Sequence, residues 1–83
     1  MAISAPTISL DPAAIDVVVT GDALRVTLSD GREVSAPLEW FPRLRDATAE
    51  QRREWRLIGR GRGIHWAGLD EDISVRGLLG LPT

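Results

Sequence analysis

The residues best suited to chemistry lie in one short stretch, GIHWAGLDEDISV, which runs from Gly63 to Val75. It places the single histidine, His65, next to Trp66 and shortly before three consecutive acids at positions 70–72. Imidazole nitrogens and carboxylate oxygens are zinc ligands, and imidazole can exchange a proton near neutral pH. The stretch is therefore where a metal site or an acid–base centre has to be tested first.

Neither kind of site is favoured by the pattern. A metal needs three or four converging ligands, and the spacing matches no calcium loop. No cysteine, lysine or tyrosine is present to act as a nucleophile beside His65. The preferred interpretation is structural, with His65 in a strand and with Asp70 and Asp72 bonding backbone N–H groups in a turn and at a helix start. We expect no catalytic residue, no metal and no cofactor, and hence no enzyme.

A glycine-rich segment, GRGRG at 59–63, allows two interpretations. Such loops hold phosphate where a strand leads into a helix, but the residues that follow here look extended and no Walker lysine is present. The alternative is a turn whose glycines adopt positive φ. In both cases we expect Arg60 and Arg62 to be exposed positive charges.

Charge is segregated along the chain, although the net charge is only −2. Residues 1–42 carry two arginines and six acids, residues 43–62 carry seven arginines and three acids, and residues 63–83 carry one arginine and three acids. The middle segment could bind nucleic acid through five arginines: Arg43, Arg45, Arg52, Arg53 and Arg56. The sequence pI of about 5.2 and the interleaved acids argue against that role.

The length of 83 residues predicts a single domain. The absence of cysteine excludes disulfides and is compatible with a reducing compartment. Residues 1–10 have no charged start followed by an apolar run, and no apolar run approaches the roughly 20 residues that cross a bilayer. We therefore expect a cytoplasmic protein that does not bind membranes.

Hydrophobic periodicity predicts an α+β fold with an antiparallel meander. Residues 1–13, with two prolines, are expected to form a flexible N-terminal arm, and 14–83 the domain. Strands are predicted at 15–20, 24–29 and 33–36, with Asp30-Gly31 as a hairpin turn. One main helix is expected over about 48–57, with Thr48 and Gln51 as a capping box.

The second half gives a less consistent pattern. Segments 55–58 and 63–66 flank the glycine-rich stretch and suggest a second hairpin or two short extended pieces, which overlaps the end of the predicted helix. Residues 67–72 are expected to form a turn. A short C-terminal helix is predicted over 75–79, with Asp72 or Ser74 as its cap.

Laid out in this way, the chain resembles the domain-of-unknown-function family numbered 2442, a group of small bacterial proteins. The resemblance is carried by DGR at 30–32, PLEWFPRL at 37–44, ATAEQR at 47–52 and WRLIGRGRGIHWAGLDEDISVRGLL at 55–79. The family pattern usually has proline where this chain has Ala67. The resemblance implies an α+β fold with an antiparallel sheet and no established catalytic activity. It also implies an antitoxin-like role beside a small toxin-like protein, or a regulator when a helix-turn-helix follows.

We therefore hypothesise a protein-binding module, antitoxin-like, that keeps a toxin-like partner inactive. The alternatives are a DNA-associated transcriptional regulator, and a small inhibitor, of the anti-defence type, of another enzyme. A homodimer through the strand that begins at Ile15 is also possible. At least two of the three tryptophans should be core, and Trp40 or Trp66 is the candidate interface anchor. The predicted protein-binding residues are Arg60, Arg62, His65, Trp66, Asp70, Glu71 and Asp72.

Overall fold

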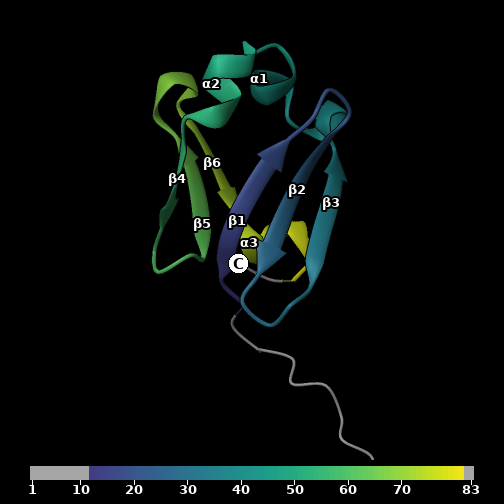
Figure 1. The fold of residues 1–83 in the computed structure, drawn as a ribbon, viewed down its shortest axis with the longest axis vertical. Helices are drawn as coiled ribbons and strands as arrows, with labels where there is room; N and C mark the ends of the chain where they lie inside the picture. The colour runs from purple at the N-terminus through teal and green to yellow at the C-terminus, as the bar shows by residue number, and fades with distance from the viewer. Residues whose placement is uncertain (1–11, 82–83) are drawn as a thin grey trace, which may run out of the picture.

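The computed structural model describes residues 12–81 and has an α+β fold with two three-stranded antiparallel sheets (Figure 1). No helix among these residues is long and apolar enough to cross a membrane. The elements, in chain order, are β1 (Ala14–Val19), β2 (Ala23–Leu28), β3 (Glu33–Pro37), the 3-10 turn η1 (Leu38–Trp40), α1 (Pro42–Arg45), α2 (Ala49–Arg53), β4 (Trp55–Ile58), β5 (Gly63–Trp66), the 3-10 turn η2 (Ala67–Leu69), β6 (Glu71–Ser74) and α3 (Val75–Leu78).

The first sheet has the order β1-β2-β3, and the predicted meander is confirmed. In β2, Leu24, Val26 and Leu28 are buried, and the residues between them are exposed or half-buried. This alternation turns one face of the sheet toward the core. Gly31 has a φ of 92°, the left-handed conformation that glycine adopts without steric cost in the turn after β2.

The second sheet has the order β4-β5-β6. The predicted second hairpin is confirmed, with Trp55 opposite Trp66 and Leu57 opposite Ile64. The turn predicted over 67–72 is wrong in its last two residues, because Glu71–Ser74 forms β6 against β5. Acidic residues are poor strand formers, so the local sequence does not indicate this strand. Pairing with β5 and burial of Ile73 determine its conformation.

The prediction of one main helix over about 48–57 is wrong in its length. The capping box is present, with the Thr48 hydroxyl accepting from the Gln51 N–H and the Gln51 side chain accepting from the Thr48 N–H. The helix ends at Arg53, however, and β4 begins at Trp55. In β4 the first and third side chains, Trp55 and Leu57, pack against the core. These residues also fit a helical spacing, but burial at every second position favours the strand that forms.

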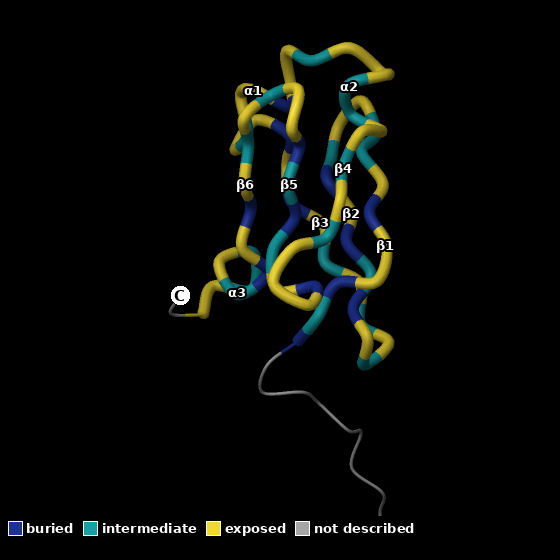
Figure 2. The backbone as a smooth tube through the Cα atoms, turned by 90° about the vertical axis from the view of Figure 1, so that its left-hand side faces the viewer, coloured by how far each residue is buried: buried dark blue, intermediate teal, exposed yellow. Residues whose placement is uncertain are grey.

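The two sheets meet along β1 and β4 and diverge toward β3 and β6 (Figures 1 and 2). The Ala14 N–H donates to the Gly61 carbonyl across this junction, at 2.7 Å. Buried residues of both sheets form one hydrophobic cluster, which fills the angle between them (Figure 2). Helices α1 and α2 cover one end of that angle, and α3 lies near the other (Figure 1).

The predicted C-terminal helix is present as α3, and its cap is Ser74, whose hydroxyl accepts from the Gly77 N–H at 3.2 Å. The predicted arm over residues 1–13 lies outside the described residues except for Pro12 and Ala13. Pro12 is among the most completely buried residues of the chain. The described part of the chain therefore begins inside the core, next to the junction of the two sheets.

Candidate functional site

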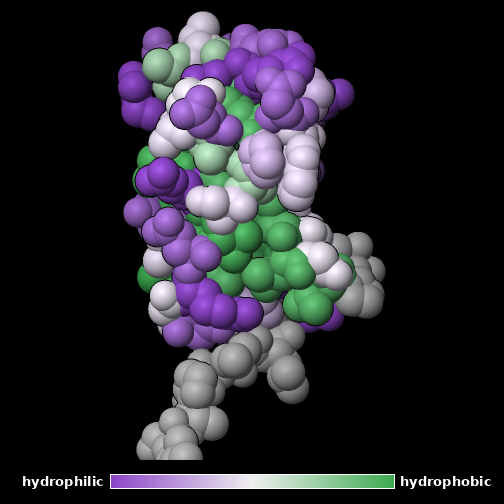
Figure 3. Space-filling model, turned by 90° about the vertical axis from the view of Figure 1, so that its right-hand side faces the viewer, coloured by the Kyte–Doolittle hydropathy of each residue, from purple (hydrophilic) through white to green (hydrophobic). Residues whose placement is uncertain are grey.

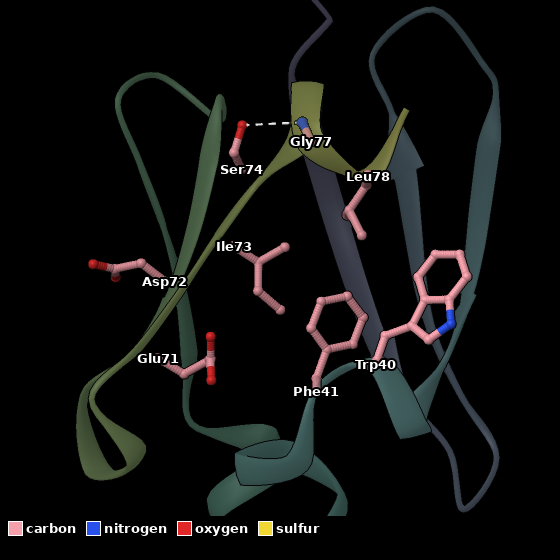
Figure 4. A pocket seen from close by; sticks show the side chains of 8 residues that line it. All are labelled: Trp40, Phe41, Glu71, Asp72, Ile73, Ser74, Gly77 and Leu78. Atoms are coloured by element: carbon pink, nitrogen blue, oxygen red, sulfur yellow. Dashed lines mark hydrogen bonds between the residues drawn. The ribbon is translucent and has the colours of Figure 1, made fainter. Parts of the chain in front are cut away.

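An apolar groove opens on the side of the molecule where the two sheets diverge. It encloses about 260 Å³ and lies between η1, β6 and α3 (Figure 4). The space-filling view of the side on which β3 lies shows hydrophobic side chains gathered in the middle of this face, with hydrophilic residues along its border (Figure 3). We refer to this concavity as the apolar groove; its lining residues are Trp40, Phe41, Glu71, Asp72, Ile73, Ser74, Gly77 and Leu78.

Strand β6 decides which of its side chains enter the apolar groove. Successive residues of a strand point to opposite faces, so Glu71 and Ile73 share one face, and Asp72 and Ser74 share the other. Figure 4 shows Glu71 and Ile73 directed toward Phe41 and shows Asp72 directed away. The predicted acidic run is therefore divided, and only Glu71 places a carboxylate in the groove.

Trp40 is the exposed tryptophan of the chain. It ends η1, a single 3-10 turn in which Leu38 is buried and Trp40 is 67% exposed. A 3-10 turn has three residues, so side chains two positions apart leave it in different directions. Phe41 follows and is half-buried against the core. The two rings thus stand at the edge of the apolar groove, one in solvent and one partly covered.

Trp66 lies in the core, so its prediction as a surface anchor is wrong. Its side chain is 0% exposed, and its indole N–H donates to the Arg52 carbonyl at 3.1 Å. The inward position follows from strand alternation, because Trp66 and Ile64 share the inner face of β5. Of the two candidate anchors, Trp40 is the one at the surface.

His65 lies on the outer face of the second sheet, opposite the apolar groove. It pairs across the strands with Arg56 of β4 and Asp72 of β6. The Nδ1 atom of His65 is hydrogen-bonded to Oδ1 of Asp72, so the expectation that Asp72 would bond a backbone N–H is wrong. Within residues 12–81 no three histidine, aspartate or glutamate side chains converge as metal ligands.

The glycine-rich stretch forms the turn between β4 and β5. Gly59, Arg60 and Gly61 have φ values of 58°, 61° and 83°, as predicted for a turn that uses positive φ. The strand that follows is β5, so the strand-to-helix arrangement of a phosphate loop is absent from this part of the described chain. Asp70 is also left-handed, with a φ of 50°, and its carbonyl accepts from Arg43 Nη1 at 2.6 Å.

The predicted protein-binding residues therefore do not form one surface. Arg60 and Arg62 occupy the β4–β5 turn and its end, while His65 and Asp72 lie on the outer face. Glu71 enters the apolar groove, and Trp66 is internal. Sequence reasoning missed Phe41, Ile73 and Leu78 as groove residues. Their apolar types fit a core equally well, so the local sequence does not distinguish the two locations.

The five arginines proposed for nucleic acid are largely occupied within the protein. Arg45 bonds the carboxylates of Glu39 and Asp46 at 3.1 and 3.0 Å, and this contact holds the pKa of Asp46 below its ordinary value. Arg52 donates to the carbonyls of Leu44 and Arg45, at 2.9 and 2.7 Å.

Two of the five arginines remain for an outside ligand. Neither Arg53 nor Arg56 shows a side-chain hydrogen bond or ion pair to another described residue. Arg52 and Arg53 line a second, wider concavity of about 640 Å³ between β1, α2 and Trp55. That concavity offers at most one uncommitted cation, because the Arg52 guanidinium is already bonded to backbone carbonyls.

Comparison with known proteins gives a family and a fold. The family model described as "Protein of unknown function (DUF2442)" matches residues 14–81. A crystal structure of a protein of unknown function from Rhodospirillum rubrum is similar, with a TM-score of 0.70 and 29% sequence identity. The match covers 84% of this chain and 88% of that one. No curated protein matches the chain. Because the family model spans most of the sequence, the chain belongs to the DUF2442 family.

Proposed function

We propose that this protein is a non-enzymatic protein-binding module whose partner docks on the apolar groove. The observation that carries the proposal is Trp40, a large ring left 67% exposed at the edge of an apolar concavity. Solvent-exposed tryptophan of this kind is uncommon in a small domain, where such rings supply core area, and tryptophan is enriched in binding hot spots. A partner that covers Trp40 would remove this ring from water together with the half-buried Phe41 and Leu78.

The polar groups of the groove support a binding role over a catalytic one. The Ser74 hydroxyl is occupied as the cap of α3. The His65–Asp72 pair, which resembles an acid–base pair, lies on the opposite face of the second sheet, away from the groove. Glu71 is the carboxylate that enters the groove, and no paired nucleophile stands beside it. The groove can therefore hold a side chain but offers no pair of groups that would transform it.

The partner that we propose is a small toxin-like protein, which this chain would hold inactive as an antitoxin-like subunit. This choice rests on the family resemblance, and the groove adds only that the partner must present an apolar segment. An anti-defence inhibitor would use the same groove against a different enzyme, and the neighbouring genes distinguish the two. We propose the cytoplasm as the compartment of such a complex.

A DNA-associated regulator is the weaker alternative. Phosphate contacts need several free cations on one surface. Of the five arginines in question, Arg43, Arg45 and Arg52 already donate to groups of the protein itself. Binding to duplex DNA that is weak and independent of salt would remove this alternative.

The test is co-expression with the products of the adjacent genes, followed by tagged purification and titration of the pair. The variant Trp40→Ala should weaken the complex at least tenfold, since truncation of a hot-spot ring costs 2 kcal/mol or more. Ile15→Ala is the matched control, because Ile15 is also an exposed large apolar residue but lies on β1. A chain that stays free beside every neighbouring product, or a complex equally weakened by both variants, would contradict the proposal.

A further inference from the structure

We infer that the apolar groove is a receptor for one basic side chain, a lysine or arginine, presented by the partner protein. The inference rests on the proposed function and specifies the chemistry of its docking site. It comes from three features of the groove: a carboxylate directed inward, two aromatic rings at the edge, and an aliphatic wall.

The carboxylate belongs to Glu71. Strand alternation sends it to the inner face of β6, and Figure 4 shows it directed toward the ring of Phe41. Glu71 is half-buried, and no hydrogen bond or ion pair joins its side chain to another described residue. A carboxylate without a partner in the protein is available to an incoming cation, and the two charges would form a charge-assisted hydrogen bond. A phosphate or a carboxylate ligand would be repelled at the same place.

The two aromatic rings and the aliphatic residues of the groove are suited to bind the charged head and the aliphatic stem of a basic side chain. A cation held over the face of tryptophan or phenylalanine is attracted by the ring quadrupole, and Trp40 and Phe41 both line the groove. Lysine and arginine also carry an aliphatic stem that packs on apolar surface while the charged head bonds elsewhere. Ile73 and Leu78 provide such a surface, and Figure 4 shows both side chains beside the ring of Phe41.

The size of the groove sets the scale of the occupant. A volume of about 260 Å³ can accommodate one long side chain but not a helix or a strand. Pockets that bind drug-sized ligands ordinarily measure about 300–1,000 Å³, so the groove lies below that range. This chain contains no lysine, and Arg43 and Arg45 on the neighbouring α1 are engaged within the molecule. The nearest cations of this chain therefore do not fill the groove, and the occupant that we infer is a residue of the partner in the proposed complex.

The adjacent residue offers a matched control. Asp72 carries the same charge one position along β6, but it points away from the groove and is hydrogen-bonded to His65. Neutralising Asp72 changes the charge of this region by the same amount as neutralising Glu71. Of the two variants, only Glu71→Gln removes a charge that faces the groove, whereas Asp72→Asn alters the hydrogen bond to His65 on the other face.

The experiment is an NMR titration of the isotopically labelled full chain with n-butylammonium and n-butylguanidinium, and with 1-butanol as the neutral counterpart. The two cations should give saturable shifts of the Trp40 indole and of the Ile73 and Leu78 methyl groups, whereas 1-butanol should bind at least tenfold more weakly. Glu71→Gln should weaken cation binding about tenfold, which matches the loss of one charge-assisted contact. Asp72→Asn should leave the affinity within about twofold of the wild type.

Two results would overturn the inference: equal binding of 1-butanol and the cations, or equal losses in Glu71→Gln and Asp72→Asn. The absence of any shift at the three reporter residues would overturn it as well. The proposed function is measured separately with the partner complex. If Trp40→Ala abolished the complex but Glu71→Gln did not affect it, the groove would still be the docking site. The inference that it receives a basic side chain would then be wrong.

Discussion

The two sheets are stabilised in different ways, although each has three antiparallel strands. The first sheet contributes six buried residues spread over its strands, Ala14, Val17, Leu24, Val26, Leu28 and Ala36. The second has four-residue strands and contributes three, Ile64, Trp66 and Ile73. The first sheet is therefore a scaffold in which no single side chain dominates. The second sheet, which forms one wall of the apolar groove, depends on one large ring and on its turns.

The strongest test of this contrast is Trp66→Ala. Loss of a fully buried ring costs about 3–5 kcal/mol, and a domain of this size has only about 4–12 kcal/mol in total. We expect a large fall in the urea midpoint, or an unfolded chain at 37 °C. Chemical denaturation followed by circular dichroism measures the change.

Two variants serve as references for Trp66→Ala. Val26→Ala removes a fully buried residue of the first sheet and should cost about 2 kcal/mol. Trp66→Phe retains most of the ring but loses the indole N–H bond to the Arg52 carbonyl, and should fall between the two. If Val26→Ala destabilised the chain more than Trp66→Ala, the proposed dependence of the second sheet on one ring would be wrong.

A second test compares one glycine from each sheet's turns. Gly31 and Gly61 both have positive φ, but a Cβ on Gly31 meets nothing within 4 Å, whereas a Cβ on Gly61 would lie 2.7 Å from the Ala14 carbonyl oxygen. Gly31→Ala should cost about 1 kcal/mol, from the left-handed backbone. Gly61→Ala should cost about 3 kcal/mol, because the junction between β1 and the β4–β5 turn must also open.

The melting temperatures of the two variants show whether Gly61→Ala adds only local backbone strain or also disrupts a rigid junction between the sheets. Equal destabilisation by Gly31→Ala and Gly61→Ala would mean that the junction yields easily and that the two sheets are not fixed to each other there. Differential scanning calorimetry of both variants in one buffer provides the comparison.

The first sheet could be predicted from the sequence because its strands obey local rules. Leu24, Val26 and Leu28 alternate with polar residues, and Asp30-Gly31 specifies the turn, so pattern and tertiary structure agree. The second sheet was predicted only as a hairpin. Its third strand, Glu71–Ser74, has acidic residues that local propensity assigns to a turn, and only contact with β5 makes it a strand.

The groove could be predicted only in part. The number of tryptophans in so short a chain suggested that one of them is an exposed anchor. The choice between Trp40 and Trp66, however, depends on whether strand β5 directs Trp66 into the core. Likewise, Glu71 and Asp72 are adjacent acids of almost equal chemistry. Strand β6, which directs them to opposite faces, was not predicted, so the prediction placed both acids on one surface.

A smaller effect is expected at the helix that leads into the second sheet. Thr48→Ala removes one half of the capping box and should cost about 1 kcal/mol. Because α2 runs directly into β4, we expect amide exchange to accelerate in β4 before it changes in β2. Hydrogen exchange monitored by NMR measures both strands in one sample. Acceleration of equal size in β2 and β4 would show that the two sheets open as one unit.

The smallest expected difference concerns a polar contact of each sheet. In the first sheet the Asp30 side chain is 5% exposed and accepts from the Arg32 N–H and Nε–H, at 3.1 and 2.9 Å. In the second sheet Asp72 bonds His65 across two strands but is 68% exposed. Solvent screens the exposed pair, so Asp72→Asn should cost about 0.5 kcal/mol and Asp30→Asn about 1–2 kcal/mol. Urea denaturation at neutral pH, with both variants in parallel, can resolve the difference. A larger cost for Asp72→Asn than for Asp30→Asn would mean that solvent does not screen the His65–Asp72 contact and that this contact contributes to the stability of the second sheet.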